Sequence, residues 1–186
     1  MTPAMIRPTK AQIDAAIIDR AAGLFARHGF THTSIQQIAD AVGYSKAGLL
    51  HHFPSKQAIY DAVLDTLLAH TQEVSARVSA LPPGRERDLA VIEAATDFNF
   101  EQPGIGALGN SIAASTQPDN ERLKAIGTHI YASLAVDLSA PDPERLIRIS
   151  VALAGVGIAS SMDIPIELKR AWRPFMIASA MGALGY

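Results

Sequence analysis

The sequence predicts an all-α protein. Apolar side chains recur at helical spacing along most of its 186 residues, and no segment alternates with period two for long enough to form a convincing strand. Apolar residues make up 48% of the chain and charged residues 18%, which is typical of a globular protein rather than a disordered one. The chain can therefore bury a substantial core, in one large domain or two small ones.

The first helix is expected at about residues 10–28. Thr9 and Gln12 form a capping-box pattern, in which each side chain can satisfy a backbone amide of the other residue. The apolar residues that follow lie on one helical face. Gly29 favours an end to this helix, because glycine readily adopts the left-handed conformation found at helix C-termini.

Two short helices with a turn between them are expected next. Thr33 or Ser34 caps the first, and Gly43 suits the left-handed turn that ends it. Ser45 caps a second helix of about seven residues, which ends before Pro54. A short helix, a glycine-containing turn and a second short helix form a helix-turn-helix arrangement.

A longer fourth helix begins at Ser55 and runs to about residue 80, where "LPPGRER" is the clearest break in the chain. Prolines and glycines separate the apolar segments beyond it. The helices expected there are 86–101, 105–116, 119–138, 143–163 and 167–184. Pro174 lies inside the last segment, so it either kinks that helix or marks its start.

Charge divides the chain in two, although the net charge is only −2. Residues 1–60 carry six Lys or Arg and three Asp, a net +3, together with four of the six histidines. The remaining ten basic and fifteen acidic residues give −5. The basic first part and the acidic second part suggest two domains, at residues 1–54 and 55–186, that meet different partners.

Several function classes find no support in the sequence. Cysteine is absent, which excludes disulfides and thiol nucleophiles, and the adjacent His51 and His52 point apart on a helix and form no metal pair. No apolar run reaches the roughly 18 residues that a membrane span needs, and no secretion signal precedes the first helix. We find no catalytic motif either. The glycine-containing stretch "GVGIAS" lies in a helical pattern and follows no strand, so it is not a nucleotide-binding Rossmann turn. We expect a cytoplasmic protein that is not an enzyme and needs no cofactor or metal.

Polar side chains on the two short helices indicate a nucleic-acid surface. In DNA-binding proteins the second helix of this arrangement enters the major groove, where its first residues meet base edges. Amides, hydroxyls and ammonium groups are the side chains that contact phosphates and bases. The outward-facing set is Gln36, Ser45, Lys46, His51 and His52. Free backbone amides at the capped helix starts add capacity to bind phosphate.

The run "LFARHGFTHTSIQQIADAVGYSKAGLLHHFPSKQAI" resembles the N-terminal DNA-binding domain of TetR-type transcriptional regulators. The matching signs are Phe25 and Gly29 at the end of the first helix, the Thr33-Ser34 start of the next and Gly43 at the turn. "SK" then opens the recognition helix and "HHFPSK" closes it. The resemblance covers about residues 9–68, roughly a third of the chain.

The resemblance implies base or phosphate contacts from the second and third helices and a phosphate contact from the start of the fourth. Many relatives carry a tyrosine where this chain has Leu50 or His51, and we expect His51 to take over its phosphate contact. His52 can instead pack locally beside Phe53, and Lys56 can be an ordinary solvated lysine. The complete DNA-facing set is Thr33, Ser34, Gln36, Ser45, Lys46, Ala47, Gly48, His51, His52 and Lys56.

The resemblance also implies an all-helical second domain that dimerises and holds a small-molecule effector. The apolar, Ala- and Gly-rich segments "VALAGVGIASSM" and "FMIASAMGALGY" can form a four-helix interface between two chains, or can fill the core of one chain. A homodimer suits a palindromic operator, because one short recognition helix makes too few contacts. Candidate effector-pocket residues are Phe98, Asn99, Phe100, Asn110, Met162 and Trp172.

These features predict a dimeric transcriptional regulator, most often a repressor in this family, whose binding to double-stranded DNA a small effector modulates. The alternative is a helical adaptor that binds protein through its exposed faces and does not bind DNA.

Overall fold

The computed structural model describes residues 8–113 and 120–186, and every regular element within them is a helix, so the predicted all-α class is confirmed. The helices are α1 (Lys10–His32), α2 (Ile35–Val42), α3 (Lys46–His52), α4 (Lys56–Val78), α5 (Arg85–Glu101), α6 (Pro103–Ala113), α7 (Glu121–Ser133), α8 (Pro143–Ser161) and α9 (Ile166–Leu184). No helix in this described part of the chain combines the length and apolar character needed to cross a membrane.

The predicted helix starts agree closely with the structure. Thr9 and Gln12 form the expected capping box of α1, and Gly29 interrupts the end of that helix with a φ of 77°. Ser34 caps α2 in a second capping box, and Gly43 adopts the left-handed conformation at its end. α1 continues to His32, four residues past the expected end at about 28, whereas α2 ends at Val42, directly before Gly43 as predicted.

Three later boundaries differ from the prediction. α6 begins at Pro103 rather than at residue 105, and residues 114–116 lie outside the described ranges. α7 ends at Ser133, five residues before the expected 138, because Ala135 takes a positive φ of 54° that stops the helix. Pro174 lies inside a continuous α9 and does not mark its start.

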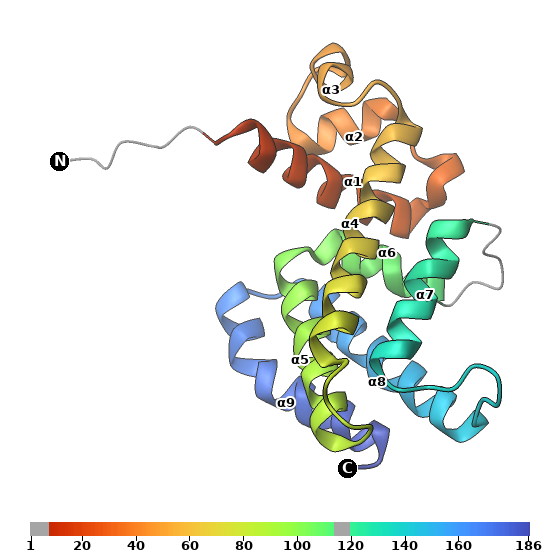
Figure 1. Ribbon diagram of the computed structural model, residues 1–186. Helices are drawn as coiled ribbons and strands as arrows, with labels where there is room; N and C mark the ends of the chain where they lie inside the picture. The colour runs from red at the N-terminus through yellow and green to blue at the C-terminus, as the bar shows by residue number, and fades with distance from the viewer. Residues whose placement is uncertain (1–7, 114–119) are drawn as a thin grey trace.

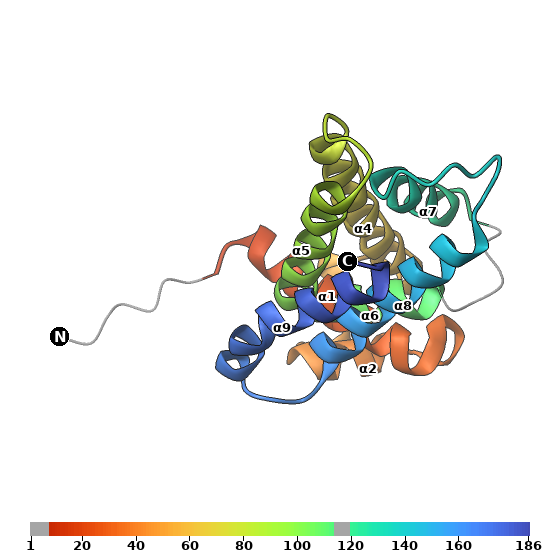
Figure 2. The ribbon, with the colours of Figure 1, turned by 90° about the horizontal axis from the view of Figure 1, so that it is seen from below.

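Helices α1–α3 form a unit at one end of the molecule, and α4 runs from this unit into the region where α5–α9 gather (Figure 1). Seen from below, α8 and α9 lie side by side and cross beneath α6 (Figure 2). The long fourth helix thus joins the two halves of the chain, as the sequence predicted.

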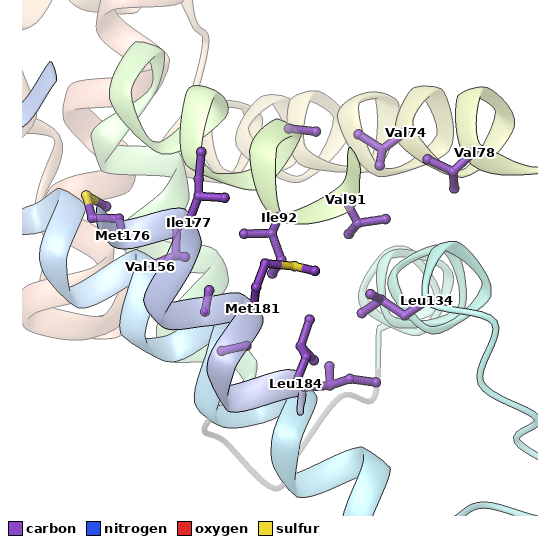
Figure 3. Packing of buried hydrophobic residues seen from close by; sticks show 14 residues of the cluster. Val74, Val78, Val91, Ile92, Leu134, Val156, Met176, Ile177, Met181 and Leu184 are labelled. Atoms are coloured by element: carbon purple, nitrogen blue, oxygen red, sulfur yellow. The ribbon is translucent and has the colours of Figure 1, made fainter. Parts of the chain in front are cut away.

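Two apolar clusters make up the core, and they do not follow the expected boundary at residues 54 and 55. The N-terminal cluster combines buried residues of α1–α3 and the first half of α4 with Ile105 and Leu108 of α6 and Ile126 of α7. The C-terminal cluster joins the second half of α4 with α5, α8, α9 and the end of α7. Figure 3 shows this cluster, with Val74 and Val78 of α4 above the side chains of α9. Helices α6 and α7 therefore share a core with the first three helices.

Polar contacts reinforce the junction between the halves. The carboxylate of Asp19 in α1 accepts hydrogen bonds from the backbone amides of Gly104 and Ile105, at 2.8 and 3.0 Å. It therefore satisfies two amides that the first turn of α6 leaves unpaired. Arg122, at the start of α7, pairs with Asp65 at 2.6 Å and with Asp61 at 3.4 Å on α4. α6 is thus tied to α1, and α7 is tied to the first half of α4.

Candidate nucleic-acid interface

The exposed surface of α2 and α3 is built by short, strongly capped helices. The Ser34 hydroxyl accepts from the Gln37 amide at 3.2 Å, and the Ser45 hydroxyl accepts from the Gly48 amide at 3.0 Å. Ile38, Ala39 and Leu49 are fully buried beneath them. Apolar packing on one side and capping at each start therefore hold both helices in place, with their polar sides outward.

Six of the predicted DNA-facing residues lie exposed on this surface. They are Ser34, Gln36, Ser45, Lys46, Ala47 and His51. The Gln36 amide donates to Asp40 at 2.7 Å, an exposed contact that a base or phosphate can replace. Gly48 is half-buried, and a Cβ at this position would lie close to the side chains of Ser45 and Tyr44. We call the start of α3, from Ser45 to Gly48, together with Ser34, Gln36 and His51, the DNA-facing surface.

Three other predicted residues form contacts within the chain. Thr33 is only 2% exposed, and its hydroxyl donates to the carbonyl of Gly29 at 2.8 Å, where α1 is interrupted. Thr33 thus stabilises the end of α1 and the connection to α2, so we leave it out of the DNA-facing surface. A β-branched residue with a hydroxyl is a good local cap, which explains why the sequence alone could not separate the two roles.

His52 joins α3 to α1. Its Nδ1 lies 2.6 Å from the carboxylate of Asp14, and its ring packs edge-on against Tyr44. The side chain is 14% exposed, so the alternative of local packing describes it better than a DNA contact. Asp14 carried no signal in the sequence, because it lies 38 residues from its partner.

Lys56 is also engaged inside the chain. Its ammonium donates to the carbonyl of Phe30 at 2.6 Å and sits 4.3 Å from the centre of the Phe30 ring. Phe30 in turn packs against Tyr60 and Phe25. A charged hydrogen bond combined with a cation–π contact holds the start of α4 against the end of α1.

The predicted effector-pocket residues do not meet in one cavity. Phe98 lines a groove between α4 and α5, and Trp172 lines a separate groove between α8 and α9. Asn99 donates to the carbonyl of Ala95 at 2.7 Å and presses against Gly106. Asn110 fits against Gly157 so closely that a Cβ there would overlap it. Both amides thus serve helix packing.

The remaining two pocket candidates lie apart. Phe100 is half-buried against the C-terminal cluster, and Met162 is 46% exposed at the end of α8. Among the residues that the structure describes, no three His, Asp or Glu side chains gather in a way that could hold a metal ion.

The exposed part of α8 and α9 is apolar. Ile158 is 68% exposed and Phe175 is 70% exposed, with Ile147 and Val151 nearby on α8. A groove of about 470 Å³ runs between the two helices, and its lining includes Gly155 and Trp172. We call this side of α8 and α9 the apolar face. Packing within one chain buries only the opposite side of α8. Filling the core of one chain, which is the second interpretation of this apolar segment, therefore does not account for all the apolar residues of α8.

The family match found by comparison with known proteins covers only the N-terminal part of the chain. The family model for bacterial regulatory proteins of the tetR family matches residues 17–63, from the middle of α1 to α4. Residues 17–63 therefore form a TetR-family N-terminal domain. The transcriptional regulator RutR of Escherichia coli K12 is 47% identical over 53 residues, which are 28% of this chain and 25% of RutR. The chain thus matches only about a quarter of that relative's length.

Two further comparisons reach beyond the TetR-family domain. The transcriptional regulator BetI of Serratia proteamaculans is 28% identical over 153 residues, covering 79% of this chain and 75% of BetI. The crystal structure of AmtR from Mycobacterium smegmatis superposes on the whole chain and on 90% of its own, with a TM-score of 0.51 and 20% identity. At that identity the likeness concerns the fold alone, and it agrees with a helical second half behind the TetR-family domain.

Proposed function

We propose that this protein is a homodimeric transcriptional regulator, acting as a repressor, whose binding to a palindromic operator responds to a small-molecule effector. The observation that carries the proposal is the exposed start of α3 within a TetR-family domain. Lys46 and Ala47 stand clear of the protein there, above a fully buried Leu49. Such a helix start can enter the major groove without any rearrangement of the core.

The DNA-facing surface offers groups of two kinds. Lys46 and Gln36 can donate to base edges, and the hydroxyls of Ser34 and Ser45 lie beside helix starts that attract phosphate. The exposed imidazole of His51 follows one turn along α3. Phosphate contacts position the domain and base contacts select the sequence, so both classes are needed for an operator-specific protein.

The apolar face supports a second copy of the chain as the partner. Large exposed side chains such as Ile158 and Phe175 lie on the same side as a groove lined by small residues. In a two-fold dimer each protruding side chain meets the same surface of the partner, so a protrusion and a groove on one face are self-complementary. Contiguous exposed apolar surface of this kind is costly in a monomer.

A response to an effector is supported by the way in which the helices of the second half divide between the two apolar clusters. α6 and α7 pack into the N-terminal cluster, while α5, α8 and α9 belong to the C-terminal cluster. A ligand that favours one arrangement of these two clusters would shift the spacing of the two recognition helices in a dimer. The coupling is then a population shift, and it needs no contact between ligand and DNA.

The test is selection of DNA from a random-sequence duplex pool by the full chain at about 150 mM salt. Recovery of one palindromic sequence, bound by a dimer in light scattering, is the expected result. The variant Lys46→Ala should weaken this binding, whereas Lys124→Ala, which removes a lysine of α7 that pairs with Glu121, should leave it unchanged. No sequence enrichment from ligand-stripped, refolded protein would reject the proposal and favour the helical adaptor.

A further inference from the structure

A tyrosine lies at the edge of the DNA-facing surface. Tyr44 occupies the turn between α2 and α3, directly before Ser45, which caps α3. Its backbone amide donates to the carbonyl of Ala39 at 2.9 Å, so the turn that follows Gly43 holds its backbone in place. Both helices lie at one end of the molecule, away from α5–α9 (Figure 1). The turn therefore presents Tyr44 at the same end as the DNA-facing surface.

The ring of Tyr44 packs along one side of α3. It is one of the half-buried apolar groups that contact the N-terminal cluster. A Cβ added at Gly48 would lie 3.3 Å from a carbon of this ring, and the His52 ring meets it edge-on with centres 5.5 Å apart. Gly48 and His52 are four residues apart, which places them on one side of the helix. The Tyr44 ring thus bridges a full turn of α3.

The hydroxyl of Tyr44 forms no hydrogen bond with any residue that the structure describes. No buried side-chain oxygen or nitrogen in this part of the chain lacks a partner, so the unpaired hydroxyl must reach the solvent. Packing explains an aromatic ring at this position, because phenylalanine would fill the same space. It does not explain the hydroxyl, which can donate to an acceptor outside the chain. Phosphate oxygens are such acceptors, and tyrosine is among the side chains that donate to them in protein–DNA complexes.

Two residues behind Tyr44 restrict the position of its ring. Nδ1 of His52 lies 2.6 Å from the carboxylate of Asp14 in α1. Because a carboxylate can only accept, Nδ1 carries the hydrogen, and this bond sets the orientation of the imidazole. Both side chains are partly buried, which shields the contact from water. Asp14 therefore orients His52, and His52 in turn supports the Tyr44 ring.

We propose that the hydroxyl of Tyr44 donates a hydrogen bond to a phosphate of the operator DNA, and that Asp14 positions Tyr44 through His52. This inference rests on the proposed function. It adds one residue that contacts DNA and two positioning residues that act only through it. Phosphate contacts set the register of a domain on the duplex, so Tyr44 serves to orient α3 and does not select a base.

The first experiment compares the parent protein with Tyr44→Phe by fluorescence anisotropy, on the selected operator and on a scrambled duplex. Tyr44→Phe should raise the Kd about threefold to tenfold on both duplexes, as expected for the loss of one uncharged hydrogen bond. The salt dependence between about 50 and 200 mM should stay the same, because a neutral hydroxyl releases no counterion. Tyr131→Phe, the same change in α7, is the matched control and should leave both Kd values within about twofold of the parent.

The second experiment tests the positioning role with a change whose electrostatic effect has the opposite sign. Asp14→Ala removes a negative charge from the DNA-binding half, which by itself would tighten binding to a polyanion. The positioning role requires the reverse, a Kd raised about threefold to tenfold. Asp14→Asn keeps an acceptor for His52 and should bind at least as tightly as the parent. In a Tyr44→Phe background, Asp14→Ala should cause no further weakening, because the hydroxyl through which it acts is already gone.

Thermal melting verifies that each variant is folded at the temperature of the titration. A Kd for Tyr44→Phe within about twofold of the parent on both duplexes would overturn the phosphate contact. Tighter binding by Asp14→Ala, or equal weakening by Asp14→Ala and Asp14→Asn, would overturn the positioning role. Absence of duplex binding by the parent protein would instead reject the proposed function, and the contact of Tyr44 with it.

Discussion

The carboxylate of Asp19 in α1 accepts a hydrogen bond of 2.8 Å from the backbone amide of Gly104 at the start of α6. One residue of the TetR-family domain thereby caps a helix of the second half, 85 positions further along the chain. The contact fixes where α6 begins, and it joins the two halves through a half-buried carboxylate.

Asp19→Ala should lower the free energy of unfolding by about 1–3 kcal/mol, because two partly buried amides lose their acceptor. Asp19→Asn keeps an acceptor oxygen and should remain within about 1 kcal/mol of the parent. Chemical denaturation of the three proteins at neutral pH measures both differences. Equal losses in the two variants would contradict a capping role.

Asp19 also predicts a pH dependence. Burial, the largest influence, raises the pKa of its carboxyl above the ordinary 3.8, and the hydrogen bonds from Ile105 and Gly104 oppose this only in part. Above pH 3.8 the unfolded chain releases this proton before the folded chain does, so the stability from this group falls as pH rises through the folded pKa. Asp19→Asn should remove that fall, which denaturation at a series of pH values detects. An unchanged profile would show that another carboxyl is responsible.

Gly104→Ala should be strongly destabilising. A Cβ at this position would overlap the carbonyl of Asp19, so α1 and α6 would have to separate. We expect a loss of about 2–4 kcal/mol in the free energy of unfolding. Gly127→Ala in α7 is the matched control, because nothing lies within 4 Å of its added Cβ. That variant should be neutral or more stable by up to about 1 kcal/mol, since alanine favours helix.

Lys46→Ala should weaken operator binding by about 1–3 kcal/mol if Lys46 reads a base, and the loss should relax the preference at one operator position. His51→Ala should instead weaken binding to all sequences alike and reduce the salt dependence, as expected for a phosphate contact. Binding isotherms on the selected operator and on scrambled duplexes separate the two patterns. Unchanged affinity on every duplex would remove Lys46 from the DNA-facing surface.

Lys56→Ala distinguishes the structural role of Lys56 from the phosphate contact implied by the resemblance. The ammonium of Lys56 donates to the Phe30 carbonyl at 2.6 Å, so its removal should lower the free energy of unfolding by about 1.5–3 kcal/mol. The salt dependence of operator binding should stay the same once the folded fraction is taken into account. A slope reduced by about one would show that Lys56 touches phosphate.

Phe175→Glu should convert the proposed dimer to a monomer. Phe175 is 70% exposed beside the α8–α9 groove, and a carboxylate there would be buried without a partner in the dimer. Light scattering after gel filtration gives the mass directly. Leu138→Glu, which changes a 52% exposed leucine in the α7–α8 connection, is the control and should remain dimeric.

Local signals carried most of the helical outline. Thr9, Ser34 and Ser45 cap helices as predicted, Gly43 ends α2, and Gly29 interrupts α1 near its end, because capping and left-handed turns depend on residues only a few positions apart. The early end of α7 was not predictable in this way, because Ala135 adopts a positive φ and no neighbouring glycine or proline indicates a helix end there. A polar, helix-starting pattern also placed the exposed residues of α3 correctly on the surface.

Contacts between distant residues needed the tertiary structure. The sequence by itself determined an all-α chain with a TetR-type domain at its start, because periodicity, caps and spacing are properties of neighbouring residues. Only the folded chain decided that His52 pairs with Asp14, that Lys56 is held by Phe30 and that Asp19 caps α6. Each of these joins elements separated by many residues. A polar side chain looks the same in sequence whether DNA or its own chain provides the partner, and packing alone decides which.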